Sequence, residues 1–310
     1  MQPLAGLLVV DLTRYLPGPF ASRELLRLGA RVVRLQAPGG DPMRELAPAW
    51  HDALNAGKES VELDLKADPE AGRKLCAQAD VVLESFRPGV VDRLGIGPRD
   101  LPDRVVYCSF TGFGGDDLTA GHDLNYQGWA GVLADTAPAV PPVQVADLGA
   151  ALRAVAQILA ALLERERTGT GRHLLISLTH SAHELVAHRL GGEPFPSLLT
   201  GGLACYRIYA TADGRHLTVA ALEPRFFARL CELAGRPELA ERQWGEEQEP
   251  LAAELAGIFI AKPLAAWLEL FDGEDVSVGP VATLEEAAAQ LRPSAAGSAN
   301  RSGSRSGTSG

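Results

Sequence analysis

One histidine occupies a position suited to proton transfer. His122 lies in the segment GHDLNY, which follows the glycine-rich run TGFGG and the strand-like segment RVVYCSF. Loops that follow the strands of a parallel sheet form the crevices in which such folds bind ligands. Histidine takes up and returns a proton near neutral pH, so His122 is a candidate catalytic residue. The alternative is a loop histidine with a purely structural role.

Two acidic residues are candidates for the same chemistry. Asp147, in the segment QVADLGAA, is an isolated carboxylate at the predicted start of a long helix. Glu223 follows the strand-like run HLTVAAL and precedes Pro224, a residue that suits the first turn of a helix. Helix capping is the alternative explanation for both, because acidic side chains often accept hydrogen bonds from the first N–H groups of a helix.

The segments around these residues alternate between strands and helices. The apolar run LLVVDL, a predicted helix over 20–28 and the strand-like RVVRL form a βαβ unit. The pattern repeats with strands in ESVELDL, DVVLES and RVVYCSF and a helix over 69–79. This alternation predicts an α/β fold with a Rossmann-like, mainly parallel sheet. No G-x-G-x-x-G motif follows the first strand, which disfavours NAD and FAD.

The pattern changes after residue 190. A helix over 147–167 and the strand HLLIS complete the first region, and the Gly/Pro-rich linker GGEPFPSLLTGG follows. Two alternating runs around Asp213-Gly214 then predict a β-hairpin, with helices after it. We therefore expect a large domain at 1–190 and a small α+β domain at 199–291. The Ser/Gly-rich segment 293–310 has no apolar residue larger than Ala, so we expect a disordered tail.

Composition limits the classes of function. The 310 residues are 46% hydrophobic and 22% charged, as in soluble globular proteins. A formal net charge of −10 argues against a nucleic-acid partner. No secretory leader is visible and no apolar run approaches the roughly 20 residues that span a bilayer, so we expect a cytoplasmic protein without a membrane partner. The four cysteines are too scattered for a zinc ribbon or a disulfide framework, and we expect reduced thiols.

Three histidines raise the question of a metal site. His180 and His183 are three residues apart, on one face of a predicted helix, and His188 follows. Their order, H-x-x-H-E, differs from the H-E-x-x-H and H-x-x-E-H orders of zinc-binding helices, and no cysteine is near. We therefore expect a helix surface that carries histidines and no metal site.

Several segments, in one order along the chain, resemble the family III CoA-transferase (CaiB/BaiF) superfamily. They are GLLVVDLTRYLPGPF, GKESVELDLK, ADVVLESFRPGVVDRLGIG and YCSFTGFG. The segments GHDLNYQGWAGVL, VADLGAA and GGLACYRIYATADGRHLTVAALEP resemble the α-methylacyl-CoA racemase branch in particular. The resemblance covers residues 4–285, and an ordered set of motifs is far more specific than any single match.

The resemblance implies an isomerase that interconverts (R)- and (S)-2-methylacyl-CoA thioesters. In the racemases, a histidine and an aspartate that match His122 and Asp147 face the substrate's α-carbon from opposite sides. Inversion by deprotonation and reprotonation requires such a pair. Glu223 matches a glutamate that supports the histidine from the small domain of a partner subunit, since the family forms interlocked homodimers. We also expect a backbone N–H at the helix start near Asp147 to stabilise the enolate oxygen.

The same resemblance implies a coenzyme A site on the large domain. The matching positions are Arg34, Leu63, Lys66, Arg87 and Gly112, of which the three cations would meet the CoA diphosphate. Each cation could equally be a solvated surface charge. Coenzyme A enters as part of the substrate, and the chemistry requires no metal or redox cofactor.

Two alternatives to a racemase stay open. The family's transferases carry a nucleophilic aspartate where this chain has His180, and a glycine-rich flap that the region around GGLACY lacks. Both departures favour the racemase. The other alternative is a silent member that only binds CoA, because a C-terminal segment that returns to the large domain in the family is missing and Ala56 stands where the family often has arginine. His122, Asp147 and Glu223 are nonetheless all present.

Overall fold

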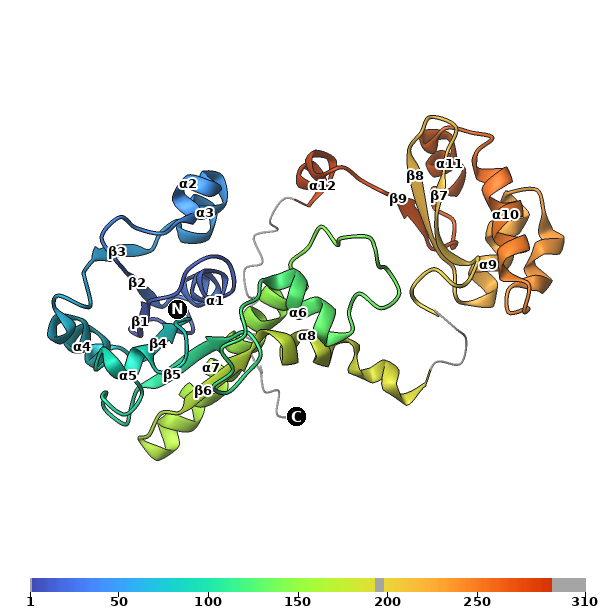
Figure 1. Cartoon of the computed structure of the whole chain (residues 1–310). Coiled ribbons are helices and arrows are strands. Elements are labelled where there is room, and N and C mark those ends of the chain that lie inside the picture. Colours follow the sequence, from blue (N-terminus) through green and yellow to red (C-terminus); the bar gives the residue numbers. More distant parts are fainter. Residues whose placement is uncertain (1, 193–197, 292–310) are drawn as a thin grey trace, which may run out of the picture. The chain divides into compact units, whose positions relative to one another are not determined.

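The chain divides into two compact units, 1–192 and 193–310, in the computed structural model, which describes residues 2–192 and 198–291 (Figure 1). The predicted tail at 293–310 lies outside the described residues, as does part of the predicted linker. Each unit has its own hydrophobic core.

Six parallel strands form the sheet of the first unit, in the order β3-β2-β1-β4-β5-β6. The strands are β1 (Leu8–Asp11), β2 (Arg31–Gln36), β3 (Glu59–Glu62), β4 (Val81–Glu84), β5 (Val106–Thr111) and β6 (His173–Ser177). The chain runs from β1 toward one edge and from β4 toward the other, so the order reverses between β1 and β4 (Figure 1). The predicted Rossmann-like sheet is confirmed. Ligand crevices of such sheets lie at the carboxyl ends of the strands beside this reversal.

Helices cover both faces of the sheet because successive side chains of a strand point to opposite faces. Val9 and Val106 pack in the cluster that includes α1 and α7, whereas Val10 and Tyr107 pack with residues of α4 and α5. The helices of this unit are α1 (Pro17–Arg27), α2 (Met43–Leu46), α3 (Pro48–Asn55), α4 (Pro69–Gln78), α5 (Val90–Arg93), α6 (Asp123–Ala130), α7 (Val145–Thr168) and α8 (Leu178–Val186), followed by the 3₁₀ turn η1 (Ala187–Gly191).

The longest helix, α7, packs against α1, α6, α8 and the strands β5 and β6. Its buried residues are mostly alanines, which allow this close approach. By length and hydropathy α7 could span a bilayer, and α10 and α11 pass the same test together as a pair bent by 101°. The expectation that no apolar run approaches such a length was therefore wrong. The place of α7 in the core accounts for its apolar character.

The second unit is an α+β structure around a three-stranded antiparallel sheet. Strands β7 (Tyr206–Ala210) and β8 (His216–Ala220) form the predicted hairpin, and β9 (Val278–Pro280) pairs with β8. Gly214 has a φ of 73°, the left-handed conformation that the tight turn requires. The helices that enclose the core are α9 (Pro224–Leu233), η2 (Pro237–Arg242), α10 (Gln248–Phe259) and α11 (Leu264–Phe271), and α12 (Leu284–Gln290) follows β9.

Candidate active site

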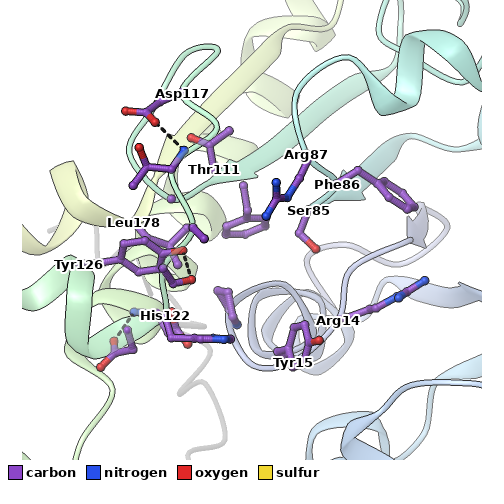
Figure 2. A pocket seen from close by; sticks show the side chains of 18 of the residues that line it. Arg14, Tyr15, Ser85, Phe86, Arg87, Thr111, Asp117, His122, Tyr126 and Leu178 are labelled. Atoms are coloured by element: carbon purple, nitrogen blue, oxygen red, sulfur yellow. Dashed lines mark hydrogen bonds between the residues drawn. The ribbon is translucent and has the colours of Figure 1, made fainter.

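The first unit contains a cavity of about 590 Å³ at the reversal of strand order. Its wall comes from the segments that follow β1, β4 and β5, from the start of α6 and from the first turn of α7 (Figure 2). Four of the predicted site residues line it: Arg87, Gly112, His122 and Asp147. The fold thus brings together residues that stand as much as 60 positions apart in the sequence.

His122 is the N-cap residue of α6, and its backbone holds it in place. Its N–H donates to Asn125 Oδ1 at 3.1 Å, and its carbonyl accepts the N–H groups of Asn125 and Tyr126. The exposed ring lies edge-on to the ring of Tyr15, with centroids 6.3 Å apart. Figure 2 shows the His122 side chain directed toward Tyr15 across the cavity mouth. The imidazole is therefore accessible for proton transfer.

Asp147 is the third residue of α7, whose N-cap is Gln144. The helix is capped instead by Asp123, whose Oδ1 accepts the N–H groups of Ala146 at 2.9 Å and Asp147 at 3.0 Å. The carboxylate of Asp147 accepts no hydrogen bond from any residue of 2–192 or 198–291, which disfavours the capping explanation of this residue.

The environment of Asp147 changes its acidity. Burial raises the pKa of its carboxyl group, and the negative charge of Asp123 raises it further, to about 7. A carboxyl group with such a pKa is present in both protonation states at neutral pH. Asp147 can therefore act as a base and as an acid under the same conditions.

Two glycines make room for Tyr126, which forms part of the wall. A Cβ atom at Gly112 would lie 2.8 Å from the Tyr126 ring, and one at Gly121 would lie 2.7 Å from it. The Tyr126 hydroxyl donates to the Gly121 carbonyl at 2.5 Å. The Gly112 carbonyl in turn accepts hydrogen bonds from the N–H and Oγ1 of Thr179, at 3.0 and 2.9 Å. Gly112 thus shapes the wall, and its predicted contact with CoA stays a prediction.

The loop between β1 and α1 contributes Arg14 and Tyr15 to the cavity. Tyr15 has a φ of 67°, which is rare for a bulky residue and is found mainly where the surroundings impose it. A buried network holds this loop: Asp11 accepts hydrogen bonds from Thr13 and Ser22, and its Oδ2 lies 3.6 Å from Lys58 Nζ. Burial lowers the pKa of Lys58 to about 8, although Asp11 opposes the shift.

A second cavity of about 640 Å³ contains the other predicted CoA-binding residues, Arg34, Leu63 and Lys66. The two cavities share Leu12, Arg14 and Phe86 as lining residues, so they adjoin. Together they are lined by residues at the carboxyl ends of β2, β1, β4 and β5.

The three predicted cations differ in their surroundings. Arg34 is buried, with its guanidinium 3.3 Å from Asp41 Oδ2 and 3.2 Å from His51 Nε2, so its charge is already compensated. Lys66 and Arg87 are exposed, and neither forms an ion pair with a described residue. Of the three, these two are the cations free to meet an anionic ligand.

Glu223 lies in the second unit, at the N-cap position of α9. Its carbonyl accepts the N–H groups of Phe226 and Phe227, while its exposed carboxylate caps nothing and makes no hydrogen bond in the part of the chain that the structure describes. Its support of His122 stays a prediction.

The remaining histidines are held by local contacts. His180 Nδ1 lies 2.8 Å from Ser177 Oγ, and His183 Nδ1 lies 3.0 Å from the Ala130 carbonyl oxygen. His188 is on η1, beyond the end of α8. Within the described ranges no three His, Cys, Asp or Glu side chains gather in a way that could hold a metal ion. His180 does not line the main cavity.

Sequence reasoning missed Asp123, Tyr126 and Tyr15. Gly112 and Gly121, which both precede Tyr126 in the chain, are visible in the sequence, but their common contact with its ring is a property of the fold. Asp123 adjoins His122, and its partners lie 23 and 24 residues away at the start of another helix. No local pattern in the sequence reports that contact.

The geometry can now be compared with known proteins. A protein-family model described as CoA-transferase family III matches residues 4–303. Mouse alpha-methylacyl-CoA racemase is 34% identical over 308 residues, which covers 92% of this chain and 79% of the racemase. Mouse succinyl-CoA:glutarate CoA-transferase is 31% identical over 322 residues, which covers 92% and 73% of the two chains.

A solved structure agrees with these matches. The crystal structure of a CAIB/BAIF family protein from Brucella suis is similar with a TM-score of 0.77 and 30% identity, over 93% of this chain and 86% of that one. The family's relatives include racemases and transferases, and both are enzymes that act on CoA thioesters. Since the family model and these relatives match nearly the whole sequence, this chain belongs to CoA-transferase family III.

Proposed function

We propose that this enzyme interconverts (R)- and (S)-2-methylacyl-CoA thioesters by moving the α-proton between His122 and Asp147. The observation that carries the proposal is the environment of the Asp147 carboxyl group. It lines the cavity together with His122, and its pKa is about 7. It does not cap α7, because Asp123 accepts those hydrogen bonds. The similarity to α-methylacyl-CoA racemases supports the same reaction.

The reaction balances without a further reactant. One residue accepts the α-proton as the C–H bond breaks, and the electron pair passes into the thioester as an enolate. The other residue, protonated at the start, donates its proton to the opposite face of the same carbon. The pair finishes with its protonation states exchanged, so each enantiomer is converted by the same two groups in opposite roles.

The enolate oxygen needs hydrogen-bond donors, and the start of α7 does not offer those that the sequence suggested. The N–H groups of Ala146 and Asp147 already donate to Asp123. At the start of α6, by contrast, the N–H groups of Asp123 and Leu124 have no acceptor among the described residues, and Asp123 lines the cavity. A free N–H at a helix N-terminus stabilises a developing negative charge, so we assign this task to α6.

A pair of adjoining cavities suits a long substrate such as an acyl-CoA, which would occupy this crevice. Arg87 and Lys66 line it, one in each cavity, form no ion pair with a described residue and are suited to the phosphates of CoA. Arg34, neutralised by Asp41, is better placed to shape the second cavity than to bind phosphate. The thioester would then lie in the main cavity, beside His122 and Asp147.

CoA transfer between carboxylic acids is the second candidate, because relatives of this chain catalyse it. It requires a nucleophile that is acylated by the substrate. The matching position in this chain is His180, which is exposed, holds a hydrogen bond to Ser177 and lies outside the lining of the main cavity. These observations favour the racemase.

Three proteins distinguish the candidates. Each of wild type, Asp147→Ala and His180→Ala is incubated with one enantiomer of a 2-methylacyl-CoA without acceptor acid, and chiral chromatography follows the second enantiomer. A racemase forms it with wild type and His180→Ala, and not with Asp147→Ala. The transferase would be established if wild type forms no second enantiomer but transfers CoA to added succinate, and if His180→Ala abolishes this transfer.

A further inference from the structure

We propose that Asp123 is a positioning residue that joins the starts of α6 and α7 and so sets the geometry of the proton-transfer pair. The inference rests on the proposed function. Asp123 is the first residue of α6, directly after His122, and its carboxylate is bonded to the turn of α7 that carries Asp147.

Both carboxylate oxygens of Asp123 accept hydrogen bonds. One carboxylate oxygen, Oδ1, accepts the N–H groups of Ala146 and Asp147, at 2.9 and 3.0 Å. The other, Oδ2, accepts the side-chain amide of buried Gln127, one turn further along α6. The Gln127 amide also lies 3.4 Å from the carbonyl oxygen of Val143, just before α7. Both oxygens are thus committed to holding the two helix starts together, and neither is free for proton transfer.

The carboxylate of Asp123 also places a negative charge beside Asp147. The pKa of Asp147 is raised first by burial and then by Asp123, the one charged group that acts on it. The other titratable groups on the cavity wall come from the remaining elements: Arg14 and Tyr15 after β1, Arg87 after β4, Asp117 after β5 and His122 and Tyr126 of the α6 region. Positioning and charge are therefore two separable effects of one side chain.

Asp123→Asn separates them. Asparagine keeps an oxygen that can accept from α7 but removes the charge, so the pKa of Asp147 should fall by about 1 unit. In the pH–rate profile, the limb that reflects the titration of Asp147 should then move to lower pH in both directions of the reaction.

Asp123→Glu tests the geometry. It keeps the charge but lengthens the side chain, so the limb should stay within a few tenths of a unit while kcat falls about tenfold or more, because the reacting groups are displaced. Asp116→Asn is the matched control, since Asp116 carries a negative charge in the loop that leads to α6 and does not line the main cavity. It should leave the limb in place.

Direct titration makes the test independent of activity. The enzyme is labelled with ¹³C-aspartate, and the carboxyl resonance of Asp147 is assigned as the one that Asp147→Asn lacks. The pH dependence of this resonance gives the pKa of Asp147 in wild type and in Asp123→Asn. A lower pKa in the variant, with the limb shifted equally, supports the proposal. An unchanged carboxyl pKa, or a kcat that Asp123→Glu leaves intact, overturns it. If wild type shows no α-proton exchange at all, the proposed function fails, and the titration alone still decides the coupling of Asp123 to Asp147.

Discussion

At the scale of single residues, the groups that hold the two helix starts differ from the groups proposed to transfer the proton. Asp123 accepts the hydrogen bonds at the start of α7, which leaves the carboxylate of Asp147 without a bond in the described chain. The backbone of His122 closes the first turn of α6, which leaves its ring at the cavity. Each chemical group can therefore be removed with little effect on the hydrogen bonds of the fold.

His122→Ala should lower the rate of α-proton exchange by about 10²–10⁴-fold, because it removes one of the two acid–base groups. The melting temperature should stay close to that of wild type, since an exposed ring contributes about 0.5 kcal/mol or less to stability. His180→Ala is the matched control and should exchange the α-proton at the wild-type rate. Full activity of His122→Ala would remove this residue from the mechanism.

Asp147→Asn should inactivate the enzyme and stabilise it at alkaline pH. The pKa of Asp147 is raised in the folded protein from 3.8 to about 7, so the folded state binds an extra proton between these values and the free energy of unfolding falls as pH rises through them. Above pH 7 the variant no longer carries this buried charge and should gain roughly 2 kcal/mol after allowance for partial solvent exposure. Denaturant unfolding at pH 5 and pH 8 measures the gain, and an equal effect at both pH values would contradict the raised pKa.

The candidate site was predictable from the sequence only in part. His122 and Asp147 stood out because a histidine after a strand and an isolated acid in an apolar segment are uncommon, and the resemblance added Arg87 and Gly112. Which acid caps α7 was not predictable, because the cap comes from a residue 23 positions away. The pairing of Arg34 with Asp41 likewise depends on the path of the chain after β2.

At the scale of elements, α6 and the loop after β5 are fitted to each other through the ring of Tyr126. The ring fills the space beside Gly112 and Gly121, where no Cβ atom fits. This contact sets the direction in which α6 begins, and with it the place of His122.

Gly121→Ala should therefore destabilise the first unit by about 1–3 kcal/mol, because a methyl group 2.7 Å from the Tyr126 ring overpacks the site. Gly128→Ala, within the same helix and with no atom near its added Cβ, should be neutral or stabilise by about 0.5–1 kcal/mol. Urea unfolding of both variants checks the pair. Equal stabilities would show that the ring is not confined by Gly121.

The elements themselves followed from the sequence where the pattern was strong. The buried strands β1, β2, β4 and β5 are rich in apolar residues, as parallel sheets require, and the Asp213-Gly214 turn predicts its hairpin. The strand predicted in ESVELDL was less exact: β3 has four residues, all exposed, because it forms the edge of the sheet. The apolar length of α7 was underestimated because interruptions by single charged residues conceal it.

At the scale of the whole molecule, the first unit contains the cavity that His122 and Asp147 line, and Glu223 lies in the second unit. The first unit also exposes large apolar side chains on α6 to α8, among them Trp129 at 78% and Leu185 at 51%. Single exposed apolar residues are ordinary, but several on adjacent helices are typical of an interface. The resemblance implies a homodimer, and we expect this face to lie in its interface.

Light scattering at micromolar concentration should therefore give twice the mass of the 32.8 kDa chain. Trp129→Glu should shift the mass toward that of one chain, because it places a charge in the apolar face. Lys74→Glu, an exposed substitution on α4, is the control and should keep the mass of two chains. A wild-type mass of one chain would contradict the dimer.

The central claim, that His122 and Asp147 exchange the α-proton of an acyl-CoA, is tested most directly by proton NMR in deuterated water. A single enantiomer of a 2-methylacyl-CoA is incubated with the enzyme and no acceptor acid, and the α-proton signal and the configuration are followed together. We expect loss of the α-proton signal with deuterium incorporation, accompanied by formation of the other enantiomer. An α-proton that persists with full retention of configuration would contradict it.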